Sequence, residues 1–168
     1  MKIMDKEENI REELLSVFRN TKVTSPIEKR LIVITERNVL PEILEFLKKR
    51  DFVQLCAISC VDWIEEKKFE LIYHLSSFKS GIHVMVKTKI DRENPVMMSM
   101  IPVFKNAQTY EREIWEMFGV QFDGNPRLIP LFLDRWEEIP PFRKDFDIRE
   151  YVKRTFDVIP SLEEKQNG

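Results

Sequence analysis

The side chains best able to do chemistry in this 168-residue chain are two histidines and two cysteines. His74 and His83 fall on neighbouring predicted strands, where they face each other across a hairpin. Cys56 and Cys60 fall on a third predicted strand and, four residues apart, share one face. Imidazole and thiolate are zinc ligands, so the chain could be a free-standing metal-dependent enzyme that uses His74 and His83. Two imidazoles on one face of a sheet account for the pattern more simply.

The cysteines are predicted to be buried, reduced thiols. Four residues of an extended strand span roughly 13 Å, which is too far for a disulfide. Reduced cysteines are typical of a cytoplasmic protein. The charged start, MKIMDKEENIREE, lacks the apolar segment of a secretory signal, and the nearly apolar stretch 53–64 is too short to span a bilayer.

Acidic residues on a predicted helix, 106–118, are a second place to look for catalysis. Glu111 and Glu113 flank Arg112, but carboxylates two positions apart on a helix point to different sides. They therefore do not form an acid/base dyad. The sequence also contains no glycine-rich phosphate loop, no nucleophile elbow and no HExxH motif, so it shows no catalytic site.

Charge excludes two classes of partner. The 27 basic and 29 acidic residues are mixed along the chain and leave a net charge of −2. Nucleic-acid binding needs a basic face, and an anionic membrane surface needs a polybasic patch. The scarcity of glycine and the wealth of Lys, Glu and Arg are compatible with a heat-adapted protein.

The N-terminal third is predicted to alternate helix and strand. Residues 5–20 have helical apolar spacing, and Ser25-Pro26 breaks that helix. The β-branched run 30–35 predicts a strand, and Pro41 opens a helix that ends near residue 50.

Three strands should follow at 53–64, 69–76 and 82–91. The first is nearly all apolar, which favours a central strand covered on both faces. The other two alternate as a hairpin with its loop at 77–80, which places Glu70 opposite Lys87. Residues 91–102 are predicted to be a connection without regular structure.

The periodic pattern stops after the helix 106–118, for which Asn106 is an acceptable N-cap and Gly119 a typical end. Residues 119–146 hold four of the nine prolines, and the stretch from Phe118 holds six of the eighteen aromatics. A solvated linker should be polar. This segment must therefore lie against a surface, either its own core or a neighbour's, and residues 120–168 are predicted to form an extended arm and tail.

The end of that segment suits docking. Pro140 and Pro141 favour a polyproline II backbone, so little entropy is lost on binding. Phe142 and Phe146 can anchor, and Arg143 can make a bidentate contact with a partner's carboxylate or carbonyl pair. The alternative is that the arm packs only on its own domain.

Residues 111–146 contain a long motif with specific spacing. It runs Glu111-Arg112-Glu113-Ile114-Trp115-Glu116-Met117-Phe118-Gly119-Val120, then Phe122-Asp123-Gly124-Asn125-Pro126-Arg127, Leu131-Phe132-Leu133-Asp134-Arg135-Trp136-Glu137 and Pro141-Phe142-Arg143-Lys144-Asp145-Phe146. This motif resembles the signature of the 30-kDa subunit of respiratory complex I. Upstream, Val61-Asp62-Trp63, Tyr73-His74-Leu75 and Asn94-Pro95-Val96 follow in the order of that family.

The resemblance implies the fold class α+β: a two-layer domain (1–119) with a mostly antiparallel sheet flanked by helices, followed by a partner-wrapping C-terminal arm. It implies a non-catalytic subunit without a cofactor, in the peripheral arm of an ion-translocating oxidoreductase on the cytoplasmic side of the membrane. Its partners would be the hydrogenase-like large (49-kDa-type) subunit and the small iron–sulfur (20-kDa-type) subunit, and only indirectly the membrane arm. Iron–sulfur clusters and any nickel, flavin or quinone would belong to partners.

Two departures from the family pattern favour a particular branch. Asn125 stands where complex I members usually carry histidine, and Phe142 replaces leucine. These differences favour a membrane-bound hydrogenase or sulfane sulfur reductase over the 30-kDa-type subunit of an NADH-quinone or F420H2-type complex. The expected partner-interface residues are Glu111, Arg112, Glu113, Phe118, Gly119, Phe122, Gly124, Pro126, Arg127, Trp136, Pro141, Phe142, Arg143, Lys144, Asp145 and Phe146.

Overall fold

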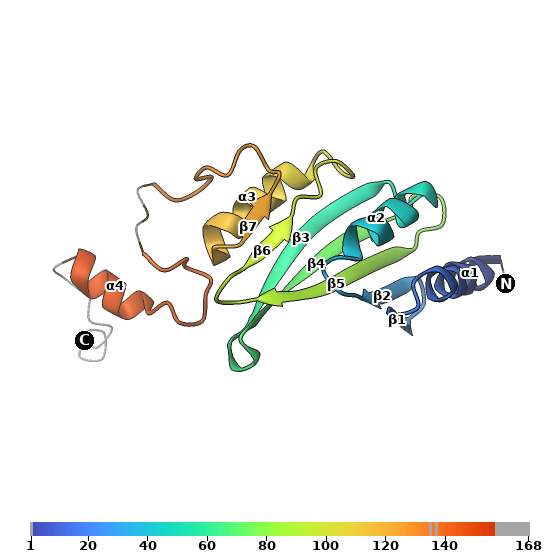
Figure 1. Ribbon diagram of the computed structural model, residues 1–168, viewed down its shortest axis with the longest axis horizontal. Coiled ribbons are helices and arrows are strands. Elements are labelled where there is room, and N and C mark those ends of the chain that lie inside the picture. The colour runs from blue at the N-terminus through green and yellow to red at the C-terminus, as the bar shows by residue number, and fades with distance from the viewer. Residues whose placement is uncertain (1, 135, 137, 157–168) are drawn as a thin grey trace, which may run out of the picture.

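The computed structural model describes residues 2–134, 136 and 138–156; the predicted tail beyond 156 lies outside this range. Its main feature is a five-stranded sheet in the order β1-β2-β5-β4-β3 (Figure 1). The β2–β5 pair is parallel and the other pairs are antiparallel. The predicted α+β class with a mostly antiparallel sheet is therefore confirmed. The strands are β1 (Lys22–Ile27), β2 (Arg30–Ile34), β3 (Gln54–Trp63), β4 (Lys68–Ser76) and β5 (His83–Asp91).

Helices lie on one side of this sheet. α2 (Leu40–Lys49) and α3 (Ala107–Phe118) bury their apolar stripes in the same core, with Tyr73 and Phe69 of β4 fully buried at its centre. α1 (Lys2–Val17) packs beside α2, where the Phe18 and Phe46 rings lie 5.4 Å apart. The helix predicted at 5–20 is thus present but displaced toward the N-terminus.

Three predictions about the strands were wrong. β1 was missed because Ser25-Pro26 was taken only as a helix break, and Pro26 is tolerated there since β1 is an edge strand. β3 was expected to be central but is the other edge. The connection 91–102 contains β6 (Val96–Met98), which pairs in parallel with β7 (Gln121–Asp123).

The hairpin register also differs from the prediction by two residues. Glu70 pairs with Lys89, and His74 pairs with Met85, so the two histidines are not opposite each other. A slip of two keeps every side chain on its predicted face. Glu70 therefore still reaches Lys87, diagonally, at 3.6 Å.

Both edges of the sheet are irregular. The pairing of β1 shifts between Thr24 and Ile27, and that of β3 shifts between Leu55 and Ala57. Side chains from α3 and its start cover the outer carbonyls at the second shift: Asn106 donates to Leu55 O at 2.8 Å and Tyr110 to Cys56 O at 2.8 Å.

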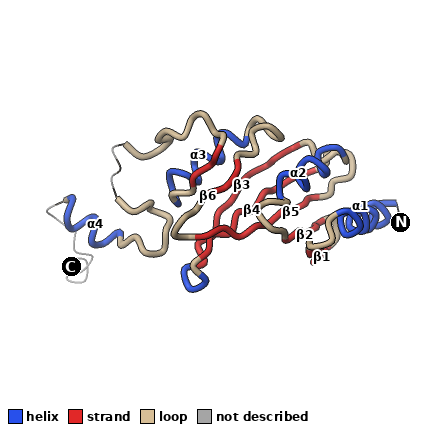
Figure 2. The backbone as a smooth tube through the Cα atoms, in the orientation of Figure 1, coloured by secondary structure: helices blue, strands red, loops and turns tan. Residues whose placement is uncertain are grey.

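The chain leaves this domain after β7. Residues 126–156, here called the arm, run back along α3 as a long loop and end in α4 (Ile148–Thr155), which stands apart from the sheet (Figures 1 and 2). Asp147 caps α4 by accepting from the backbone N–H groups of Arg149 and Glu150. Within the described residues, no helix is long and apolar enough to cross a membrane.

Candidate functional site: the attachment of the arm

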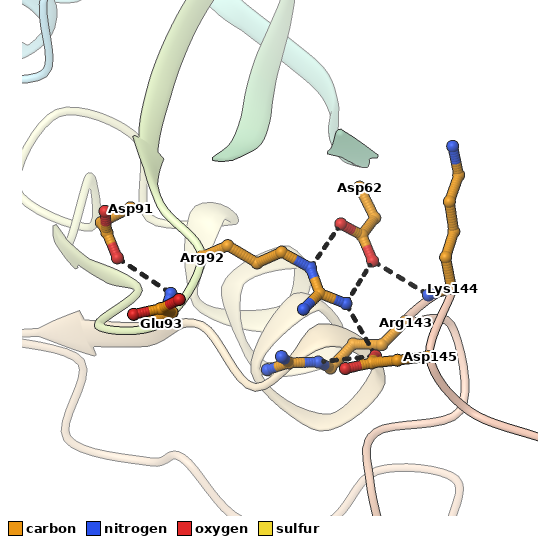
Figure 3. A network of polar contacts seen from close by, with 7 residues as sticks. All are labelled: Asp62, Asp91, Arg92, Glu93, Arg143, Lys144 and Asp145. Atoms are coloured by element: carbon orange, nitrogen blue, oxygen red, sulfur yellow. Dashed lines mark hydrogen bonds and ion pairs between the residues drawn. The ribbon is translucent and has the colours of Figure 1, made fainter. Parts of the chain in front are cut away.

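The end of the arm is fastened to the domain by one buried ion-pair network, here called the latch (Figure 3). Arg92 binds Asp62 in a bidentate manner, with Nε–Oδ1 at 2.7 Å and Nη2–Oδ2 at 3.0 Å. The same Nη2 donates to Oδ1 of Asp145 at 2.7 Å, and the backbone N–H of Lys144 donates to Asp62 at 2.9 Å. The domain thus holds the arm through one carboxylate and one guanidinium.

Burial and charge together set the ionisation of the latch. The Asp62 and Arg92 side chains are only 2% and 10% exposed. Burial raises the pKa of Asp62, but the hydrogen bonds from Arg92 and Lys144 outweigh it and leave that pKa below its ordinary value. The hydrogen bond from Arg92 likewise lowers the pKa of Asp145. All three groups are therefore charged at neutral pH.

A turn at the end of β5 presents Arg92. The Asp91 carboxylate accepts from the backbone N–H groups of Glu93 at 2.9 Å and Asn94 at 3.0 Å. These bonds, the one from Asn94 above all, and the ammonium of Lys68 lower the pKa of Asp91 to about 2. Arg92 also donates its own backbone N–H to Lys67 O. The backbone that carries the Arg92 side chain is therefore held in place by hydrogen bonds on both sides of it.

Arg143 makes its contacts within its own chain. Its Nε lies 3.3 Å from Asp145, and its guanidinium lies 5.5 Å from the centre of the Phe69 ring. Arg92 approaches the same ring at 5.7 Å. The Arg143-Lys144-Asp145 motif therefore serves the attachment of the arm within this chain.

The beginning of the arm is held by a second device, here called the clamp, which consists of Arg112 and Glu116 on α3. Arg112 donates to the carbonyl oxygens of Ile129 at 2.6 Å and Pro130 at 2.5 Å. Glu116 accepts from three consecutive backbone N–H groups, at 3.0 Å or less from each nitrogen. These amides belong to Leu131, Phe132 and Leu133. Because the two residues are one turn apart, one helix face binds the backbone of five successive residues, 129–133.

Between clamp and latch the arm crosses the end of α3. Gly119 has φ +79°, and a Cβ at this position would lie 3.2 Å from Cγ of Pro140. Phe142 donates its backbone N–H to Met117 O at 3.0 Å and packs its ring edge-on against Phe118 at 5.7 Å. The glycine is therefore required both by the left-handed backbone and by the close approach of the arm.

Aromatic rings join the loop of the arm to α4, the helix at its end. Trp136 lies 5.4 Å from Phe146 and 4.9 Å from Tyr151, measured between ring centroids. The predicted interface residues Trp136 and Phe146 thus lie in an internal cluster. Pro141 is partly buried between Pro140 and Phe142.

Glu111 is buried beneath the start of the arm. Its carboxylate accepts from Ser99 Oγ at 2.7 Å, from Met100 N at 2.6 Å and from Asn125 Nδ2 at 2.9 Å. Burial raises the pKa of Glu111, against these hydrogen bonds. Asn125 therefore supplies a neutral hydrogen-bond donor to this carboxylate.

The other predicted residues of this region differ in their exposure. Phe122 is buried, and Gly124 adopts φ +93° in the turn that leads to the arm. Glu113, Pro126 and Arg127 are exposed.

Sequence reasoning missed the roles of Asp62, Arg92 and Glu116. Asp62 and Arg92 are 30 residues apart, and Asp145 is a further 53 residues along the chain, so no local pattern joins them. The spacing of Arg112 and Glu116 on one helix face was the available signal for the clamp.

The alternative site at the histidines and cysteines does not assemble. His74 Nε2 lies 3.2 Å from Ser59 Oγ, while Cys56 is exposed and lies beside Ser76. Burial raises the pKa of Cys60, so this thiol stays protonated. Over the described residues, no three His, Cys, Asp or Glu side chains are grouped to hold a metal ion.

The arm shows its apolar side chains to solvent although its backbone is bound. Phe132 is 65% exposed and Phe142 59% exposed. Ile129, Ile139, Ile148 and Phe156 are exposed as well. An arm that packed only on its own domain would bury these side chains, because burial of such groups is what stabilises packing.

Comparison with known proteins gives the family. The family described as respiratory-chain NADH dehydrogenase, 30 Kd subunit, matches residues 33–152. This chain belongs to that 30-kDa subunit family. A relative from the F(420)H(2) dehydrogenase of Methanosarcina mazei is 34% identical over 131 residues, 74% of this chain and 79% of the relative. A relative from the NADH-quinone oxidoreductase of Rhizobium johnstonii is 38% identical over 131 residues, 76% of this chain and 65% of the relative.

Two solved structures share the fold of this 30-kDa subunit family member. A chain of the membrane-bound sulfane sulfur reductase, an archaeal respiratory membrane complex, matches with a TM-score of 0.88 and 32% identity. The match covers 97% of this chain and 98% of that one. The trypsin-resistant fragment (1-134) of Nqo5 matches with a TM-score of 0.63 and 24% identity, over 72% of this chain and 98% of the fragment.

Proposed function

We propose that this chain is a non-catalytic, cofactor-free subunit in the peripheral arm of a complex I-like membrane-bound oxidoreductase. In this proposal it docks on the hydrogenase-like large subunit and lies close to the small iron–sulfur subunit. It stays at the cytoplasmic side of the membrane through these partners. The partners carry the redox groups and the coupled translocation of H+ or Na+.

The observation that carries the proposal is that the backbone of the arm is bound while its apolar side chains are exposed. Clamp and latch bind its backbone and its charged groups, while Phe132 and Phe142 stay mostly exposed. A backbone held in place with outward apolar side chains is a preorganised docking surface, because little conformational entropy remains to be lost on binding. Exposed aromatic anchors are the residues that dominate protein–protein interfaces.

The extent of the matches supports one kind of complex over the others. The sulfane sulfur reductase chain matches along almost its whole length, arm included, and the two dehydrogenase relatives match over 65–79% of theirs. We therefore favour a complex of the sulfane sulfur reductase type over the F420H2 or NADH-quinone types. The identity of the proteins in the natively purified complex, determined by mass spectrometry, tests this choice.

The test of docking uses Phe132→Asp in the complex assembled from its own subunits. An aspartate in the centre of an apolar contact should reduce co-purification of the large subunit at least tenfold. The matched control is Phe78→Asp, since Phe78 is 79% exposed. It belongs to the β4–β5 loop, which lies at the end of the sheet opposite α4 (Figure 1). Unchanged co-purification of Phe132→Asp, with a native circular dichroism spectrum, would falsify the proposal.

A further inference from the structure

The face of the sheet turned away from α2 and α3 has no helix of the described chain on it (Figure 1). Strand alternation places Leu31, Val84 and Tyr73 in the core, so their neighbours point to the opposite side. This surface, here called the open face, carries Arg30, Ile32 and Ile34 of β2, Met85, Lys87 and Lys89 of β5, Ile72 and His74 of β4, and Ala57, Ser59, Val61 and Trp63 of β3.

A hollow of about 370 Å³ lies in the open face. It crosses four strands: Arg30 is paired with His83, and Met85 with His74. Cys56 and the small residues Ala57 and Ser59 of β3 complete it. Small side chains of β3 therefore line one side of the hollow, and longer ones of β2 and β5 line the other, with His74 of β4 between them.

Charge on the open face is unevenly compensated. Lys87 pairs with Glu70 at 3.6 Å, and Lys68 with Asp91 at 3.1 Å. Arg30, at the rim of the hollow, has no carboxylate within 4.0 Å among the residues that the structure describes. A guanidinium beside an apolar depression matches a carboxylate that arrives with apolar neighbours.

Apolar side chains extend beyond the hollow, which favours a macromolecule over a small ligand. Ile34 of β2 is 44% exposed and Trp63 of β3 is 40% exposed. A second copy of this chain fits poorly, because the described carboxylates on this face, such as Glu70, already pair with its lysines and leave none for Arg30.

We propose that the open face is a second docking surface, and that its hollow receives a carboxylate flanked by apolar residues from a subunit other than the one bound by the arm. This inference rests on the proposed function only in assuming a multisubunit complex. It would make the chain a bridge between two partners.

The test places the photo-crosslinker p-benzoylphenylalanine at position 85 or position 132 of the chain within its co-expressed complex. Position 85 should crosslink a peptide that contains Asp or Glu, from a different subunit than position 132 does. Position 78 is the control, because Phe78 is highly exposed but lies in the β4–β5 loop, outside the open face.

Charge reversal supplies the second arm of the test. Arg30→Glu should reduce the crosslink from position 85 at least tenfold, while Arg37→Glu, in the loop between β2 and α2, leaves it unchanged. The inference is overturned by a yield at 85 no higher than at 78, or by a crosslink to the subunit that position 132 reaches. Crosslinks to another copy of the chain or to residues 157–168 overturn it equally, as does an unaffected Arg30→Glu.

The two proposals fail separately. If Phe132→Asp leaves co-purification intact while position 85 crosslinks an acidic peptide of another subunit, docking through the arm is contradicted and docking through the open face is supported. If position 85 gives no specific crosslink while Phe132→Asp loses the large subunit, the reverse holds.

Discussion

Latch and clamp use the same kinds of groups, an arginine and a carboxylate, but they differ in what they bind. The latch joins charged side chains in the interior, and Asp62 there is 2% exposed. The clamp carboxylate, Glu116, is buried as well, at 8% exposed, but the peptide groups of residues 129–133 that the clamp binds lie nearer the surface. A buried charge that loses its partner is costly, whereas peptide groups released from the clamp can turn to water. The latch should therefore govern stability, and the clamp should govern only the local position of the arm.

Removal of the latch carboxylate should have the largest effect. Asp62→Ala leaves Arg92 buried without its bidentate partner and should lower the free energy of unfolding by about 3–5 kcal/mol. Urea denaturation of the isolated chain measures this loss. A loss under about 1 kcal/mol would show that the latch is no stronger than a surface ion pair.

Acid should open the latch. The pKa values of Asp62 and Asp145 lie below the ordinary 3.8, so their stabilisation is complete above that value. It is lost as the pH falls through the lower folded-state values. Amide exchange at Lys144, whose N–H binds Asp62, should accelerate only in this acid range. Acceleration already between pH 5 and 7 would contradict the lowered pKa values.

Removal of the clamp carboxylate should have a smaller, local effect. Glu116→Ala frees the amides of residues 131–133, and a hydrogen bond to a charged group contributes about 1.5–3 kcal/mol. Exchange at these amides should rise at least tenfold, while Lys144 is unaffected. Glu113→Ala is the matched control, since Glu113 is exposed on the same helix. Equal acceleration at Lys144 would mean that clamp and latch act as one unit.

The smallest effect should come from an arm side chain that neither device binds. Phe132→Ala keeps the backbone N–H that Glu116 accepts, so the free energy of unfolding should change by less than about 0.5 kcal/mol. Binding of the large subunit, measured by co-purification, should nonetheless weaken. A stability loss above about 1 kcal/mol would place Phe132 in the packing of the arm.

Local patterns predicted the elements whose signals are local. α2 and α3 follow from Pro41, Asn106 and Gly119 together with apolar spacing. Asn106 nevertheless binds Leu55 O instead of capping its helix, because the edge of β3 lies within its reach. The register of β4 and β5 was missed because a loop of six residues, 77–82, satisfies the two-residue alternation as well as the shorter one predicted.

The candidate site likewise has a part with a local sequence signal and a part without one. The length of the motif at 111–146 drew attention to this part of the chain, and Arg112 within it binds the beginning of the arm. The orientation of Arg143 was not predictable, because it depends on Asp145 and on Phe69, 74 residues earlier in the chain. Long-range ion pairs leave no periodic trace in a sequence.

The irregular edges of the sheet affect how the free subunit behaves before it joins a complex. Pro26 removes a backbone donor from β1, and the outer carbonyls of Leu55 and Cys56 on β3 are already occupied. Register shifts on both strands further disfavour hydrogen bonding of these edges to a strand of another chain. A newly made subunit with exposed aromatics would otherwise be at risk of strand-by-strand aggregation. The two edges therefore favour a free subunit that stays monomeric until it binds its partners.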